Sequence, residues 1–196
     1  MIVARESVGQ TLRQGDFVEG QSMERAELMQ AIMKAAYLEG EFVLRSGQRS
    51  KYYLDKYLFE TDPCILAELG RLLAARCSDR TQRIAGAELG GVPLAAAAAM
   101  AARKPFVIVR NAKKDYGTSK QLEGRLDPGD VVLLVEDVVT TGGQLLEAAR
   151  ALTDAGATVE RIVAVIDREQ GARENVEAGG WRFDALFTKT ELGISI

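Results

Sequence analysis

The 196-residue sequence contains no histidine. This absence excludes Ser-His-Asp and Cys-His catalysis, histidine metal centres and a histidine general base. Cysteine is scarce as well, because Cys64 and Cys77 are too few and too isolated for a disulfide framework or a four-ligand zinc site. Two such thiols fit a reducing cytoplasm, which is the compartment we expect. Any chemistry must therefore use carboxylates, lysines, arginines, backbone amides or a bound metal.

The sequence also lacks a hydrophobic run long enough to cross a bilayer. The apolar run 93–102 has only about half of the ~20 residues that a span needs. The first residues show no signal-peptide pattern. A net charge of −3 gives no general reason to expect nucleic acid or acidic lipid as a partner. We expect no nucleic-acid and no membrane partner, so any phosphate site must be built locally.

The order of apolar segments predicts one α/β domain at 23–196, preceded by a flexible extension at 1–22. Helices are predicted at 24–37, 63–76, 93–102, 143–155 and 173–178. Strands are predicted at 41–44, 52–54, 83–87, 106–110, 131–135 and 161–167. Fully apolar strands that alternate with helices indicate a parallel sheet covered on both faces, which binds its ligand at the carboxyl ends of the strands.

The most informative stretch is 131–149, VVLLVEDVVTTGGQLLEAA. Its apolar run predicts a buried strand that delivers Glu136 and Asp137 to the edge of the sheet. The sequence TTGG at 140–143 then opens directly into a helix. Such a turn directs backbone N–H groups, two hydroxyls and a helix N-terminus to one point, which suits a phosphate monoester. The two acids suit vicinal ribose hydroxyls, with a metal ion nearby to offset their charge.

This string closely resembles the signature with which type I phosphoribosyltransferases bind 5-phosphoribosyl-1-diphosphate (PRPP). The resemblance implies a parallel-sheet α/β fold with helices on both faces, in which a small N-terminal hood (23–60) covers a core (61–196). It implies that Glu136 and Asp137 bind the ribose hydroxyls, and that Mg²⁺ is held mainly by PRPP. It assigns the 5-phosphate to Thr140, Thr141, Gly142, Gly143 and Gln144. Gln144 departs from the usual Thr or Ser, which changes one hydroxyl but leaves the backbone nest. An ordinary strand–turn–helix crossover is the alternative for this segment.

Three further segments resemble orotate phosphoribosyltransferases in particular. The first, 42–63, is similar to the family's early hairpin that closes over the base. By that resemblance Arg45 contacts the substrate, while Tyr52 and Tyr53 flank the base. An ordinary hairpin with exposed arginines and core tyrosines is the alternative.

The second segment, AGAELGGVPLA at 85–95, resembles the glycine turn that contacts the pyrophosphate group. This resemblance assigns Gly90 to the PRPP site, although a plain strand-to-helix turn would need the same glycines. Outside these segments, the resemblance adds Thr140 and Arg168 to the orotate site. An arginine at the end of a strand can hold a carboxylate through a bidentate pair that lysine does not reproduce.

The third segment, VRNAKKDYGTSKQLEGRL at 109–126, resembles the family's mobile catalytic loop, with the usual pattern Arg-Lys-x-x-Lys-x-His-Gly. The matching positions are Arg110, Lys114 and Gly117, and the departures are Asn111 and Tyr116. We expect Lys114 and Arg110 to act in catalysis together with Asp137, and Lys113 to substitute for the lysine absent at position 111. The alternative is an ordinary solvated loop. The missing lysine predicts weakened turnover.

The resemblance implies that a homodimer transfers the phosphoribosyl group from PRPP to orotate, forming orotidine 5′-monophosphate and pyrophosphate. Two alternatives are a transferase for another nucleobase and a non-catalytic PRPP-binding regulator. The basic and aromatic residues of the expected orotate site argue against the first, because a neutral base needs no carboxylate clamp. The 22-residue extension is too short for a helix-turn-helix and the chain is acidic, which argues against the second.

Overall fold

The computed structural model describes residues 22–43, 49–111 and 121–194. The helices are α1 (Arg25–Ala36), α2 (Lys56–Glu60), α3 (Pro63–Ala74), α4 (Gly91–Ala102), α5 (Gly143–Asp154) and α6 (Ala172–Ala178). The strands are β1 (Tyr37–Val43), β2 (Arg49–Leu54), β3 (Arg83–Ala87), β4 (Phe106–Val109), β5 (Leu122–Glu123), β6 (Val131–Val139), β7 (Thr158–Asp167) and β8 (Phe183–Thr188). Within these ranges no helix has both the length and the hydropathy needed to cross a membrane.

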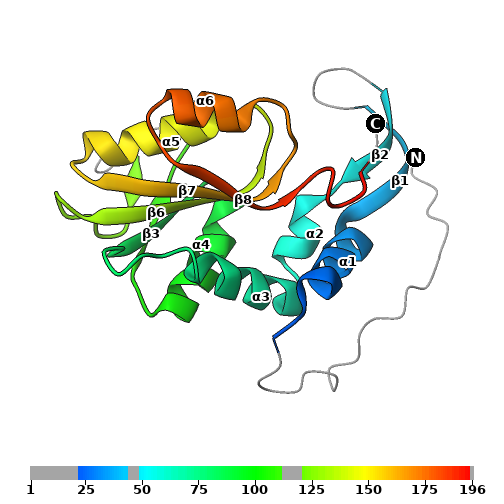
Figure 1. The fold of residues 1–196 in the computed structure, drawn as a ribbon, viewed down its shortest axis with the longest axis horizontal. Helices are drawn as coiled ribbons and strands as arrows, with labels where there is room; N and C mark the ends of the chain where they lie inside the picture. The colour runs from blue at the N-terminus through cyan, green and yellow to red at the C-terminus, as the bar shows by residue number, and fades with distance from the viewer. Residues whose placement is uncertain (1–21, 44–48, 112–120, 195–196) are drawn as a thin grey trace.

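The main sheet has the strand order β5-β4-β3-β6-β7-β8. Its strands pair in parallel except for the short β5, which runs antiparallel to β4. The strands β1 and β2 form a separate antiparallel hairpin that lies to one side of the sheet (Figure 1). The prediction of a mostly parallel α/β sheet is therefore confirmed.

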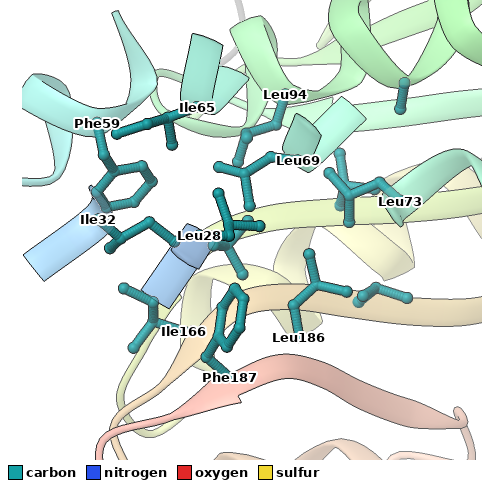
Figure 2. Packing of buried hydrophobic residues seen from close by; sticks show 14 of the residues in the cluster. Leu28, Ile32, Phe59, Ile65, Leu69, Leu73, Leu94, Ile166, Leu186 and Phe187 are labelled. Carbon is teal, nitrogen blue, oxygen red and sulfur yellow. The ribbon is translucent and has the colours of Figure 1, made fainter. Parts of the chain in front are cut away.

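Helices cover both faces of this sheet, with α5 and α6 on one side and α3 and α4 on the other (Figure 1). Successive side chains of β6 pack alternately on the two faces of the sheet. Leu133 packs in the same hydrophobic cluster as α1, α3 and α4, whereas Leu134 packs in the cluster of α5 and α6. In the first cluster Leu28 of α1 lies near Phe187 of β8, and Phe59 of α2 lies near Ile32 of α1 (Figure 2). This cluster joins the N-terminal helices to the sheet that carries the predicted phosphate loop.

The alanine-rich helix α4 lies very close to its neighbour α3. A Cβ atom on Gly70 of α3 would come within 2.8 Å of the backbone of Ala97, so only glycine fits at this contact. The small residues of α4 therefore allow two helices to pack tightly under the sheet.

The strands differ from their predicted boundaries more than the helices do. Strand β1 begins four residues earlier than predicted, and β2 and β7 each begin three residues earlier. Strand β6 continues to Val139, so Glu136 and Asp137 lie within the strand and not after it. Helix α2 and the strands β5 and β8 were not predicted. The predicted helices at 24–37, 63–76, 93–102, 143–155 and 173–178 all form, with ends that differ by no more than two residues.

Candidate active site

The predicted phosphate loop joins β6 to α5. Thr140 and Thr141 are exposed, Gly142 has a left-handed backbone with φ of 81°, and Gly143 begins α5. No side chain caps this helix among the described residues, and a Cβ on Gly143 would meet no atom within 4 Å. The start of α5 is therefore uncapped and unobstructed at Gly143, and a free helix N-terminus is suited to binding an anion.

A contact from α6 holds the loop in place. The side-chain amide of Asn175 donates a hydrogen bond of 2.8 Å to the carbonyl oxygen of Thr141. This bond ties the loop carbonyl to α6. The loop is thus supported by the neighbouring helix as well as by the strand that precedes it.

The paired acids have different surroundings. Asp137 is only 1% exposed, and its Oδ2 accepts a hydrogen bond of 2.5 Å from Nζ of Lys56 on α2. Glu136 is partly exposed, and its Oε1 accepts from the backbone N–H of Asp137 at 3.1 Å. Burial works to lower the pKa of Lys56, but the hydrogen bond to Asp137 and the surrounding carboxylates outweigh it, so the pKa is raised and the side chain carries its charge. Lys56 was not among the predicted site residues.

Gly90, at the predicted pyrophosphate turn, lies directly against Asp137. A Cβ at position 90 would be 1.5 Å from Oδ2 of Asp137 and 2.9 Å from Oε1 of Glu60. No side chain fits there unless the acid moves. The glycine turn and the acidic pair therefore form one continuous wall.

Glu60 is the third carboxyl group at this place. It is 1% exposed, and neither of its oxygens has a hydrogen-bond partner among the described residues. Burial, followed by the negative charge of Asp137, raises the pKa of Glu60 to about 8. Although part of the Glu136 side chain is exposed, burial of its carboxyl group and the charge of Asp137 raise its pKa well above its usual range. Glu60 and Glu136 therefore retain protons at neutral pH, which lowers the electrostatic repulsion among the three carboxyl groups.

The protonation of Glu60 leads to a prediction about stability. The unfolded chain ionises Glu60 near its ordinary value of 4.5, whereas the folded chain keeps the proton until about pH 8. The free energy of unfolding therefore falls as pH rises from about 5 to 8. We expect Glu60→Gln to raise this free energy by roughly 2–3 kcal/mol at pH 8 and by less than about 0.5 kcal/mol at pH 5.

Urea unfolding at both pH values checks this prediction. Glu174→Gln on the exposed surface of α6 is the matched control, and its effect should be the same at both pH values. The same change in the free energy of unfolding at pH 5 and pH 8 in Glu60→Gln would contradict the raised pKa.

Three of the residues predicted to bind the base meet in one pocket, whereas Thr140 is not among the residues that line it. Tyr52 and Tyr53 of β2 line it together with Arg168, which follows β7. The Tyr52 ring stacks on that of Tyr37 at a centroid distance of 5.6 Å. The other residues that line the pocket are Leu54, Ile166, Lys189 and Ile194. Two aromatic rings and two cations make this pocket suited to a planar anion.

The base of the predicted catalytic loop lies beside α5. The N–H of Arg110 donates to the carbonyl of Gln121 at 2.8 Å, and its guanidinium is 3.6 Å from the carboxylate of Glu123. The N–H of Asn111 donates to Glu88 Oε2 at 3.2 Å. A polar recess here is lined by Arg110, Asn111, Gln121, Gln144 and Glu147, among others. The ends of β3 and β4 thus lie next to the phosphate loop.

Three of the predicted site residues, Arg45, Lys113 and Lys114, lie outside the described residues. Sequence reasoning missed Lys56, Glu60 and Lys189. A signal for the first two was present, since they stand four residues apart in the segment KYLFE and so lie on one side of a helical turn.

Comparisons with known proteins agree with this geometry. The family model of the phosphoribosyl transferase domain matches residues 60–182. The chain is 45% identical to an orotate phosphoribosyltransferase of Natronomonas pharaonis over 171 residues, which cover 87% of this chain and 98% of the relative. It is 48% identical to that of Halobacterium salinarum over 167 residues, covering 85% and 95% of the two chains.

Solved structures give the same result. Orotate phosphoribosyltransferase of Mycobacterium tuberculosis in complex with Fe(III) dicitrate superposes with a TM-score of 0.78 at 32% identity, covering 87% of this chain and 99% of that one. A complex of the Mycobacterium tuberculosis protein with PRPP gives a TM-score of 0.74 at 31% identity, with the same coverage. The identity and coverage of these relatives, together with the match of the family model, place this chain in the phosphoribosyltransferase family, among the orotate phosphoribosyltransferases.

Proposed function

We propose that this protein transfers the 5-phosphoribosyl group from PRPP to N1 of orotate, forming orotidine 5′-monophosphate and pyrophosphate, a step of pyrimidine biosynthesis. The observation that carries this proposal is the position of two sites on one sheet edge. The anion-binding turn at 140–143 follows β6, and the tyrosine-lined pocket with Arg168 follows the adjacent strand β7. A sugar phosphate in the first site can present its anomeric carbon to a base in the second.

The turn 140–143 binds the 5-phosphate through the first N–H groups of α5 and the two threonine hydroxyls. Glu136 and Asp137 accept hydrogen bonds from the ribose hydroxyls. The close approach of Gly90 to Asp137 leaves backbone N–H groups, and no side chain, beside the diphosphate. These contacts orient the bond that breaks, and the diphosphate leaves as its oxygen takes the bonding electron pair.

The base site acts mainly by orientation. Tyr52 and Tyr53 flank the ring, and the guanidinium of Arg168 pairs with the carboxylate of orotate. N1 of orotate loses its proton to water before transfer, and the resulting anion supplies the electron pair for the new bond to the anomeric carbon. The sequence has no histidine, so the site contains no imidazole base for this proton.

Mg²⁺ fits the chemistry of the acidic wall. Among the described residues no three acidic or cysteine side chains are arranged to hold a metal ion by themselves. We propose that PRPP oxygens supply most of the ligands, with Glu136 and Asp137 as the nearest protein carboxylates. The ion would neutralise charge on the leaving diphosphate.

The loop cations Arg110 and Lys114 would share this neutralisation in catalysis, while Lys113 contacts PRPP in place of the lysine absent at position 111. One preorganised charge in a closed site contributes roughly 2–4 kcal/mol. Asn111 is exposed, so we expect Asn111→Lys to recover only about 1.4 kcal/mol of this and to raise kcat about tenfold. The Kd for PRPP should change by less than about threefold. Steady-state kinetics and titration calorimetry measure the two quantities, with Asn111→Gln as the uncharged control. An unchanged or lower kcat would count against this role of the loop.

We also propose that the protein works as a homodimer in which each loop 112–120 reaches the site of the partner subunit. Sedimentation equilibrium tests the oligomeric state. A mixture of inactive Asp137→Asn and loop variants tests the shared site, because mixed dimers would recover activity only if the loop acts across the interface.

A panel of nucleobases tests the assignment of substrate. The protein with Mg²⁺ and PRPP is mixed with orotate, uracil, adenine, guanine or hypoxanthine, and released pyrophosphate is measured. We expect release with orotate alone. Release with another base would show a different transferase, and PRPP binding without release from any base would show a PRPP-binding regulator.

A further inference from the structure

Lys189 lies at the base pocket, although it follows the last strand and belongs to none of the segments that carry the sequence motifs. It lines the same pocket as Tyr52, Tyr53 and Arg168. Asp167 of β7 and Thr188 of β8 are register partners, and the N–H of Lys189 donates to the carbonyl of Asp167 at 2.8 Å. Arg168 and Lys189 therefore leave two adjacent parallel strands at the same level.

Acidic side chains at the ends of β7 and β8 next to Lys189 are engaged elsewhere. Glu169 accepts from the N–H of Thr190 at 2.9 Å. Glu191 pairs with Arg25 at 2.7 Å, and Asp167 accepts from the N–H of Glu169 at 2.8 Å. Within the part of the chain that the structure describes, neither Arg168 nor Lys189 has an ion-pair partner. Two uncompensated cations thus face one pocket, which favours an anionic occupant.

The segment that carries Lys189 is firmly anchored. After β8 the chain turns back past α2 towards the β1–β2 hairpin (Figure 1), and Leu192 and Ile194 are each only 7% exposed. Arg25 of α1 donates to the carbonyl of Leu186 at 2.7 Å, and its guanidinium lies 4.6 Å from the centre of the Phe187 ring. The position of Lys189 is therefore set by the core before any ligand binds, which lowers the entropy lost on binding.

We propose that Lys189 is a specificity-determining residue that binds the carboxylate of the base together with Arg168. This inference rests on the proposed function. Arg168 supplies the bidentate contact. The ammonium group of Lys189 adds a second positive charge from the end of the adjacent strand β8. A base without a carboxylate would leave both cations unpaired in the pocket, which disfavours its binding.

Three variants test this role: Lys189→Gln, Lys189→Arg, and Lys34→Gln on the exposed surface of α1 as the control. We expect Lys189→Gln to raise the KM for orotate about tenfold, as lost charge-assisted hydrogen bonds commonly do. The KM for PRPP and the thermal midpoint should each stay close to those of the unmodified protein. The inhibition constant of uracil should not rise, because uracil has no carboxylate to pair with Lys189 and Lys189→Gln removes one unpaired cation. Lys189→Arg should restore most of the affinity, and Lys34→Gln should change nothing.

The outcomes separate this inference from the proposed function. No consumption of orotate by the unmodified protein would overturn the proposed function. Normal consumption with an unchanged KM for orotate in Lys189→Gln would overturn the role of Lys189 alone. Parallel losses for orotate, PRPP and thermal stability would assign Lys189 a purely structural role and overturn it as well.

Discussion

Asp137→Asn is expected to lower kcat/KM for PRPP by about 10²- to 10³-fold, the loss typical of one preorganised polar group that stabilises a transition state. The carboxylate is almost fully buried, so it interacts with a ribose hydroxyl in a medium of low effective dielectric constant, where electrostatic interactions are strong. Positive charge develops on the ribose ring as the diphosphate departs. A neighbouring carboxylate stabilises that charge, and a neutral amide does not.

The same change also removes the negative partner of Lys56, so folding must be measured beside activity. Breaking a buried ion pair can cost about 3–5 kcal/mol, although Lys56 is 34% exposed and should lose less. Glu136→Gln provides the second test, because Glu136 forms no ion pair with Lys56. Asp154→Asn at the exposed end of α5 is the control. Normal PRPP kinetics in both site variants would contradict the role of the acidic pair.

Arg168→Gln should reduce kcat/KM for orotate by about 100-fold, since loss of a charged hydrogen-bonded pair costs roughly 2–3 kcal/mol. The KM for PRPP should change less than about twofold, because Arg168 lines the base pocket and not the phosphate turn. Arg168→Lys should recover only part of the loss, since lysine keeps the charge but not the planar pair of donors.

Steady-state kinetics with each substrate varied in turn separates these effects. Arg150→Gln on the exposed face of α5 also removes one arginine charge, at a position that does not line the base pocket. This variant should leave both constants unchanged. Equal losses for PRPP and orotate in Arg168→Gln would place Arg168 outside the base site.

The sheet could be predicted from the sequence because its strands are continuous apolar runs separated by amphipathic helices. The end of β6 could not, because two acidic residues normally mark the end of a buried strand. Here Asp137 stays within the strand because the amine of Lys56, which comes from α2, compensates its buried charge. That partner stands 81 residues away in the sequence, so the apolar pattern holds no information about it.

Helix α2 escaped prediction for a related reason. Its five residues are too few to show a helical period, and its start depends on the side chain of Asp55, which accepts from the N–H of Tyr57 at 3.2 Å. The apolar pattern of β8 is interrupted by Asp184. This carboxylate pairs with Arg76, which follows α3, and with Arg161 of β7. The contacts that favour β8 are tertiary, whereas the contact that starts α2 is a local cap.

Some parts of the candidate site could be predicted from the sequence and others could not. Contiguous groups such as the turn at 140–143 could be predicted because the backbone itself forms the binding geometry. Lys56, Glu60 and Lys189 reach the site from segments that carry no motif of their own. Only the three-dimensional arrangement shows that the C-terminal turn and the hairpin enclose one pocket.

Titration calorimetry of PRPP in the presence of Mg²⁺ tests the central claim most directly. The turn at 140–143 and the acids of β6 should give saturable binding of one PRPP per chain, and this binding should weaken strongly in the Glu136→Gln/Asp137→Asn double variant. Absence of saturable heat in the unmodified protein, or equal binding by the folded double variant, would contradict the account.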